Sequence, residues 1–295
     1  MHDAAYYIQL LLSGVTVGSL YALIAIGYTM VYGILRLINF AHGDIFMMAG
    51  FFMVYMAASM PMAVSIPLVL ILTVALGVAI EKAAYSPLRT SPRMSVMISA
   101  IGVSYLLQNL ANYVTGGIAR DYPDIPFLTQ VLQVGGLSMK RITIITPILT
   151  ILLVVVLVIL IQKTKIGMAM RAVSRDFETS QLMGIKINSV ISMTFVIGSF
   201  LAGVASILYF SNYGQVSPMI GAMPGLKAFV AAVFGGIGSI PGAVIGAFII
   251  GICESFIKAN ETIAVFSNAF TFALLIVILL CKPNGLFGEK LTEKV

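Results

Sequence analysis

The chain has 295 residues, of which 60% are hydrophobic and only 9% are charged, and its formal net charge is +6. Soluble domains carry charge on roughly 25% of their residues, so this composition excludes a soluble globular protein. The basic residues are scattered among short loops without an aromatic-lined basic groove, so binding of nucleic acid does not explain the net charge. The composition is typical of a helical protein that crosses a membrane several times.

Apolar stretches long enough to span the hydrocarbon core, which takes about 20 residues, recur along the whole chain. We predict nine candidate spans, at residues 8–28, 44–60, 64–81, 94–114, 142–161, 190–210, 221–237, 241–257 and 264–281. The seventh is irregular because it carries Lys227 and Pro224, so the predicted count is eight or nine. The predicted fold class is therefore all-α, a polytopic membrane protein in which residues 1–295 form one transmembrane domain.

The basic loops predict the orientation of these spans. Lys82, Arg89 and Arg93 share one loop, and a second basic loop follows two spans later, so both lie on the same side of the membrane. Cytoplasmic loops carry an excess of Lys and Arg, which predicts that this side and the C-terminal tail, residues 282–295, are cytoplasmic. The first residues, MHDAAYYIQ, lack the pattern of a secretory signal, so we expect the first span to stay in the mature protein.

Two segments interrupt the apolar pattern and predict discontinuous helices. Residues 27–50 place polar side chains between apolar runs, and residues 235–246 pack five glycines and a proline between apolar halves. Non-helical backbone at membrane depth is tolerated only where protein or a water-filled cavity satisfies it, and broken helices often mark a transport route. With a polar patch in the fourth span, the predicted translocation path comprises Asn39, His42, Asp44, Gln108, Asn112, Gly235, Gly236, Gly238 and Ser239.

Structural interpretations of these polar residues stay open beside the functional one. A loop at the membrane surface would accept the same residues near His42 without any role, and Gln108 and Asn112 could serve only to join spans by hydrogen bonds. His42 has no second histidine nearby, so we predict no metal site. Glu254 lies inside an apolar run and is expected to pair with Lys227 or Lys258. Cys253 and Cys281 are interpreted as packing residues.

A basic segment, residues 162–188, separates the fifth and sixth spans and holds five of the seventeen Lys and Arg residues. Helical spacing puts apolar side chains on one face and charged ones on another: Ile166, Met170, Val173 and Phe177 on the first, Arg171, Arg175 and Glu178 on the second. Gly167 and Gly184 bracket this helix. The pattern predicts an amphipathic helix beside the bilayer on which a partner docks; the alternative is an ordinary basic loop.

The sequence carries no motif for nucleotide hydrolysis or other enzyme chemistry. It has no G-x-x-x-x-G-K-[ST] phosphate loop, no H-E-x-x-H pattern and no serine in a nucleophile elbow. We therefore predict a transport protein without cofactor, whose energy comes from a partner or from an ion gradient. An ion-coupled secondary transporter with Glu254 or Asp44 as the coupling carboxylate, and a passive channel, are the competing classes.

Four segments resemble the permease subunits of branched-chain amino acid ABC importers, and most closely the shorter of their two permeases. They are INFAHGDIFMMAG at 38–50, GMAMRAVSRD at 167–176 with MGI at 183–185, KAFVAAVFGGIGSIPGAVIGA at 227–247, and KPNGLFG at 282–288. The resemblance covers nearly the whole chain in order.

The resemblance implies a subunit of a multi-protein importer in a bacterial inner membrane. A second, related permease would form a heterodimer with this one, two cytoplasmic ATPases would bind ATP beneath them, and a periplasmic or lipid-anchored binding protein would deliver leucine, isoleucine or valine. The loop at about 162–189 would hold the coupling helix, which sits in an ATPase cleft, through Ile166, Gly167, Met170, Arg171, Ala172, Val173, Arg175, Asp176, Phe177 and Gly184. Permeases for urea and short amides share much of the pattern, so they are the alternative within the family.

Overall fold

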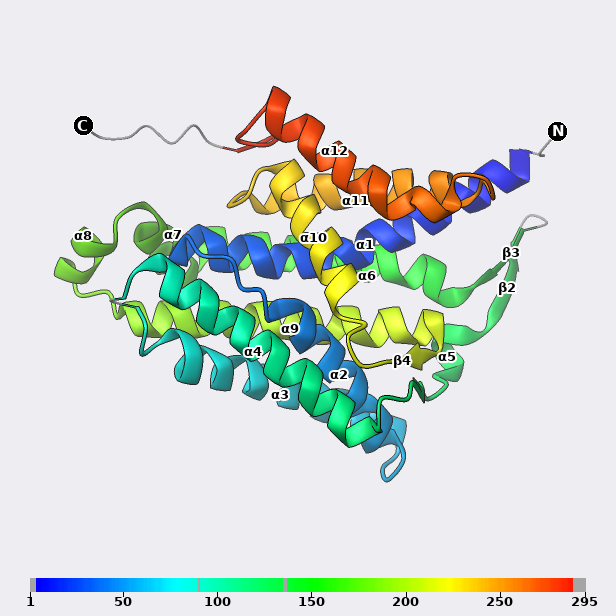
Figure 1. The fold of residues 1–295 in the computed structure, drawn as a ribbon, viewed down its shortest axis with the longest axis horizontal. Helices are drawn as coiled ribbons and strands as arrows, with labels where there is room; N and C mark the ends of the chain where they lie inside the picture. The colour runs from blue at the N-terminus through cyan, green and yellow to red at the C-terminus, as the bar shows by residue number, and fades with distance from the viewer. Residues whose placement is uncertain (1–3, 90, 135–136, 289–295) are drawn as a thin grey trace.

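The structure is a computed structural model, and it describes residues 4–89, 91–134 and 137–288. The predicted tail beyond residue 288 lies outside this range. The described chain is almost entirely helical (Figure 1). Its elements are α1 (Ala4–Leu35), α2 (His42–Ala57), α3 (Met62–Ile80), the π-helix η1 (Glu81–Tyr85), α4 (Arg93–Thr115), β1 (Arg120–Asp121), α5 (Pro126–Thr129), β2 (Val131–Val134), β3 (Leu137–Lys140), α6 (Arg141–Lys163), α7 (Lys165–Arg175), α8 (Phe177–Leu182), α9 (Ile187–Tyr213), β4 (Gln215–Val216), α10 (Ala222–Gly235), α11 (Ile240–Lys258), the 3-10 helix η2 (Ala264–Phe266) and α12 (Ser267–Cys281).

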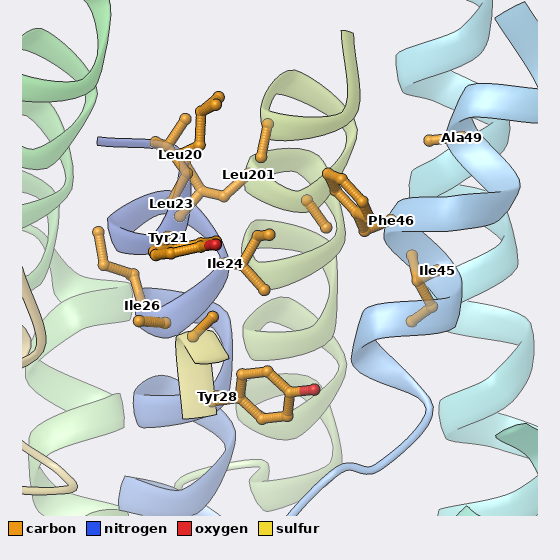
Figure 2. Close-up of a cluster of buried hydrophobic side chains, with 14 of the residues drawn as sticks. Leu20, Tyr21, Leu23, Ile24, Ile26, Tyr28, Ile45, Phe46, Ala49 and Leu201 are labelled. Carbon is orange, nitrogen blue, oxygen red and sulfur yellow. The ribbon is translucent and has the colours of Figure 1, made fainter. Parts of the chain in front are cut away.

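Helices α1 and α9 form the centre of the bundle. Helix α1 packs against α11, α9, α10 and α6, and α9 also packs against α3 and α2. Side chains such as Ile24 of α1, Leu201 of α9 and Phe46 of α2 fill the space between these helices (Figure 2). In contrast, α6 and α12 bury only 17% and 11% of their most apolar stretches, so they are outer helices whose apolar sides face away from the bundle.

The two ends of the bundle differ in structure. At one end, which we call the hairpin end, β2 and β3 form an antiparallel hairpin and β1 pairs with β4. At the opposite end, which we call the basic end, lie α7 and α8 (Figure 1). The chain thus has short extramembrane structure at both ends and no separate soluble domain within the described residues.

Seven helices of the described chain are long and apolar enough to cross a membrane, and two apolar helices are too short. The short ones are α2 and α10, with 16 and 14 residues. The predicted all-α fold with discontinuous helices is confirmed. The predicted spans at 44–60 and 221–237 correspond to α2 and α10, whose bounds differ from the predicted ones by two or three residues at each end at most.

Helices α2 and α10 begin inside the bundle rather than at its surface. After α1 ends, at Arg36 with a φ of 55°, the chain runs back along the bundle before α2 starts at His42, and the chain between β4 and α10 does the same from the other end (Figure 1). The backbones of the two helix starts touch: a Cβ on Gly43 would lie 2.6 Å from the carbonyl oxygen of Gly221. Both glycines are buried, and we call this contact the half-helix junction.

The C-terminal segment folds back onto the end of α10. The amide of Leu286 donates to the carbonyl of Phe234 at 3.0 Å, and that of Phe287 donates to Gly235 at 2.9 Å. The last carbonyls of a helix have no partner within it, so these bonds satisfy the C-terminus of α10. The KPNGLFG stretch at 282–288 and the glycine-rich segment that follows residue 234 are thus in direct contact.

The half-helix junction predicts a strict size limit at Gly221. A Cβ there would lie 2.2 Å from the carbonyl oxygen of Gly43, and backbone cannot yield as a flexible side chain can. Overpacking usually costs about 1–3 kcal/mol, so we expect Gly221→Val to lower the unfolding temperature in detergent by several degrees or to prevent folding. Gly33→Ala is the control, because a Cβ on Gly33 would be 3.9 Å from its nearest neighbour. Equal stability of the two variants would contradict the junction.

Candidate functional site

The basic segment, residues 162–188, folds as two helices instead of the single helix that the sequence pattern predicted. The hydroxyl of Thr164 accepts a hydrogen bond from the amide of Gly167 at 3.1 Å and caps α7. Helix α7 ends at Arg175, and Asp176 then caps α8 by accepting from the amide of Thr179 at 3.0 Å. The predicted helix through Phe177 is therefore wrong, since a capping residue has non-helical backbone. Gly167 lies within the first turn of α7.

The apolar face of α7 is buried against its own chain. Met170 and Val173 are 4% and 1% exposed, and a Cβ on Gly167 would lie 2.2 Å from the carbonyl oxygen of Ile161. The helix lies against α6, α1, α9 and α8. Met170, Val173 and Gly167 are thus positioned to anchor α7 to the bundle, whereas Arg171 and Arg175 remain exposed and Ala172 is half-buried.

Several apolar side chains of the basic segment are exposed. Leu182 and Met183 are 88% and 78% exposed, and Met168, Ile166 and Phe177 are also exposed. Asp176 and Gly184 lie in the same exposed surface, and Gly184 has a φ of 82°. Sequence reasoning missed Met168, Leu182 and Met183, although an apolar pair in a polar segment was a signal for them. Exposed apolar groups rimmed by charge are typical of an interaction surface.

A cavity of about 1220 Å³ lies at the basic end, between α1, α6, α7, α11 and the C-terminal segment. Its charged lining consists of Arg36, Arg171 and Arg175, with no Asp or Glu among the described lining residues. Two of these side chains donate to backbone oxygens, Arg36 to Ser174 and Arg171 to Gln162, each at 3.3 Å. The predicted path residues Gly238 and Ser239 lie in the wall of this cavity. Gly238 and Ser239 therefore share this cavity with residues of α7.

A polar group surrounds the start of α2. The carboxylate of Asp44 accepts hydrogen bonds from Ser104 at 2.5 Å and from Gln108 at 3.0 Å, both on α4. Asn39 accepts from the hydroxyl of Tyr85 at 2.7 Å and from the amide of Ala41 at 3.1 Å. The bonds to Asn39 hold the non-helical stretch before α2 in place. The bonds to Asp44 fix the first turn of α2 against α4, since buried polar groups are usually hydrogen-bonded.

The predicted path residues therefore fall into two separate groups. Asn39, His42, Asp44 and Gln108 are brought together near the half-helix junction, where the ring of His42 packs 4.9 Å from that of Tyr28. Asn112 lies one turn beyond Gln108 on α4 and is exposed. The second group comprises Gly235, Gly236, Gly238 and Ser239, which lie where α10 ends, near the C-terminal segment.

A buried ion cluster joins three helices of the bundle. One carboxylate oxygen of Glu254 lies 2.6 Å from the amino groups of both Lys227 and Lys258, and the other accepts from the hydroxyl of Tyr21 at 2.9 Å. The predicted pairing of Glu254 is confirmed with both lysines. A second buried carboxylate, Glu81, pairs with Arg89 and accepts from Ser192 at 2.9 Å. Both clusters satisfy charges that would otherwise be costly inside the protein.

Metal or disulfide chemistry finds no support in the described residues. No group of three or more His, Cys, Asp or Glu side chains there is placed to hold a metal ion. Cys253 and Cys281 are both free. The geometry consists of a helical bundle, an exposed basic segment at one end and polar clusters inside.

Comparison with known proteins identifies the class of this bundle. Residues 10–279 match the family described as "Branched-chain amino acid transport system / permease component". The chain belongs to this permease family. It is 40% identical to the high-affinity branched-chain amino acid transport system permease protein BraD of Pseudomonas aeruginosa, with 100% of each chain covered. It is 43% identical to the corresponding permease protein LivH of Escherichia coli K12, with 98% of each covered. A probable branched-chain amino acid transport permease of Methanocaldococcus jannaschii is 27% identical over 95% of this chain and 92% of its own.

The family confirms the resemblance inferred from the four sequence segments, and with the seven long apolar helices it makes this chain a multi-pass membrane permease. Its relatives are components of transport systems rather than enzymes. The polar clusters and the exposed basic segment are thus features of a transport component.

The ion cluster predicts an order of stability among three permease variants. Removing one partner of a buried pair costs about 3–5 kcal/mol, and Glu254→Gln leaves two lysines without their carboxylate. Lys227→Met should cost less, because Lys258 still lies 2.6 Å from Glu254. Lys258→Gln should cost least, because the side chain of Lys258 is 51% exposed. Unfolding temperatures in detergent would measure this order, and a Lys258 variant as unstable as the Glu254 variant would contradict it.

Proposed function

We propose that this permease is a subunit of an ATP-driven importer and forms the translocation path for branched-chain amino acids that an extracytoplasmic binding protein delivers. The observation that carries the proposal is the full-length similarity to the two bacterial permeases, at 40% and 43% identity over at least 98% of each chain. A match of this extent covers the bundle, the basic segment and the C-terminal segment together. It favours leucine, isoleucine and valine over urea or short amides as substrates.

The energy for import comes from other chains. The sequence has no phosphate loop, so ATP is bound and hydrolysed by two cytoplasmic ATPase subunits. The basic end faces the cytoplasm of a bacterial inner membrane, in keeping with its arginines. A second, related permease completes the membrane part as a heterodimer within the surrounding lipid, and the binding protein approaches the hairpin end.

The exposed part of the basic segment is the surface on which an ATPase docks. Its apolar contacts are Ile166, Met168, Phe177, Leu182 and Met183, and its charged contacts are Arg171, Arg175 and Asp176. Gly167, Met170, Ala172 and Val173 anchor α7 to the bundle, and Gly184 ends the surface. An ATPase that moves α7 therefore moves α1, α6 and α9 with it, because α7 is packed against them. Interfaces of this kind change by shifts of packed elements.

The half-helix junction is the part of the bundle best suited to form the translocation path. Two helices begin there inside the protein, and helix N-termini carry partial positive charge that attracts carboxylates. Asp44 of α2, which is bonded to Gln108, and Lys227 of α10, which is paired with Glu254, place further polar groups on these two helices. An amino acid has an apolar side chain and two charged groups, so it needs such a mostly apolar passage with few polar contacts.

Transport by purified components tests the proposed function. The permease, its second permease and two ATPases are reconstituted in liposomes with the binding protein, and uptake of labelled leucine is measured with ATP. We expect uptake only with the complete set, and none by this chain alone under a proton or sodium gradient. Competition by isoleucine and valine but not by urea would support the substrate class. Gradient-driven uptake by the chain alone would overturn the proposal in favour of a secondary transporter.

A further inference from the structure

Helix α4 differs from the other outer helices in the chemistry of its exposed side. Like α3, α6 and α12, it is poorly covered by its own chain, and only 22% of its most apolar stretch is buried. Its mean hydropathy over that stretch is 1.4, against 2.6 for α3, 3.3 for α6 and 2.4 for α12. Helix α4 contacts mainly α2 and η1. Helix α4 is thus the least apolar of the four outer helices, and its exposed side carries polar residues beside apolar ones such as Ile98, Leu106 and Tyr113.

The polar residues of α4 form a seam on its exposed side. Tyr105, which is 63% exposed, lies on this side with the exposed Asn109 and Asn112. The seam begins at Ile98 and continues through Gly102, so its members are spaced by four, three, four and three residues. This alternation is the spacing at which one helix packs along another. The buried stripe of the same helix, with Ala100, Leu107 and Ala111, lies on its opposite side.

The middle of the seam leaves room for another backbone to approach. A Cβ on Gly102 would meet no atom within 4 Å, so this glycine serves no close contact within its own chain. Small residues at such positions let two membrane helices pack closely. The amide of Asn109 donates one hydrogen bond to the carbonyl of Tyr105 at 2.8 Å. Its oxygen and its second N–H, like the amide of Asn112, can still bond to another helix, and acyl chains can satisfy neither function.

The exposed sides of the other outer helices provide an internal comparison. Exposed residues of α3 and α6, such as Ile71, Ile148 and Ile151, are apolar, as expected for contact with lipid. Asn109 lies six residues before the end of α4, within a helix of 23 residues, so its amide is below the membrane surface. A soluble partner would not reach it, whereas a membrane-spanning helix would.

We propose that the seam Ile98, Gly102, Tyr105, Asn109 and Asn112 is the surface against which a membrane-spanning helix of the second permease subunit packs. The proposal rests on the proposed function, which supplies a second, related permease. A related chain is favoured as the occupant because amide side chains complement one another across a helix pair and fix its register. Ser104 and Gln108 flank the seam and bond to Asp44, so the interface adjoins the half-helix junction.

Photocrosslinking in membranes tests this surface with the complete importer. A photoreactive phenylalanine derivative replaces Tyr105 in the seam, and in the control it replaces Ile151, which is exposed on α6. We expect the seam variant to shift on a denaturing gel to the summed mass of the two permeases, and the control to stay at the mass of one chain. An adduct with a second copy of this chain, or no protein adduct, would overturn the proposal.

A substitution that adds a bulky side chain to the seam tests the interface independently of folding and of the proposed function. Gly102→Leu should leave the isolated chain as stable as the natural one, because nothing lies near that position, but should cause a several-fold loss of co-purified second permease. Ala75→Leu, at an exposed position of α3, is the matched control and should lose none. If the Gly102→Leu variant retains the second permease fully while the importer still takes up leucine with ATP, the proposed interface is overturned. The proposed function would then stand.

Discussion

The contact between the backbones of Gly43 and Gly221 is the constraint on which the rest of the bundle depends. A membrane interior supplies no water to backbone N–H and C=O groups, so a helix can begin there only if protein surrounds its start. Helices α2 and α10 both begin at this contact, and the stretches leading to them must be held by buried groups. Asn39 with Tyr85 and Asp44 with α4 provide this support. The polar side chains of the first broken segment are therefore explained first by the need to build a helix start inside the protein.

The same constraint connects the two ends of the permease. Helix α1 contacts α7 at the basic end, α10 at the junction and α11 along much of its length. Glu254 joins α11 to α10 through Lys227 and to α1 through Tyr21. A displacement of α7 thus reaches both α2 and α10 through one continuous set of packed elements. Because close-packed interiors transmit strain, the buried anchor of α7 matters as much as the exposed surface that we propose for docking.

Much of the fold follows from the sequence, since apolar stretches predicted eight or nine spans, and the described chain has seven helices long and apolar enough to cross a membrane and two shorter apolar ones. The depth at which α2 and α10 begin did not follow, because an apolar run shows how much chain is buried and not where in the bundle the helix starts. The pairing of Glu254 with Lys227 could be predicted because a charge in an apolar run needs a partner. The pairing of the C-terminal segment with Phe234 and Gly235 could not, because it depends on tertiary packing.

The basic segment shows where periodicity misleads at a candidate site. Its spacing placed Met170 and Phe177 on one face, but the cap at Asp176 separates them, so Met170 is buried and Phe177 is exposed. An Asp three residues before Thr179 was readable as a cap, yet the helical pattern ran past it. Anchoring and the proposed docking thus fall on different residues of one segment, whereas periodicity offered the two faces of a single helix as candidate contact sets.

Docking of the ATPases through the exposed tip of α8 is the most direct test of this account. Leu182→Asp with Met183→Asp is compared with Val265→Asp, which changes an exposed apolar side chain in η2. The account predicts that the double variant inserts and folds as the natural chain does but loses both co-purified ATPase and ATP-driven uptake, while the η2 variant keeps the ATPase. Full recovery of the ATPases by the double variant would contradict it.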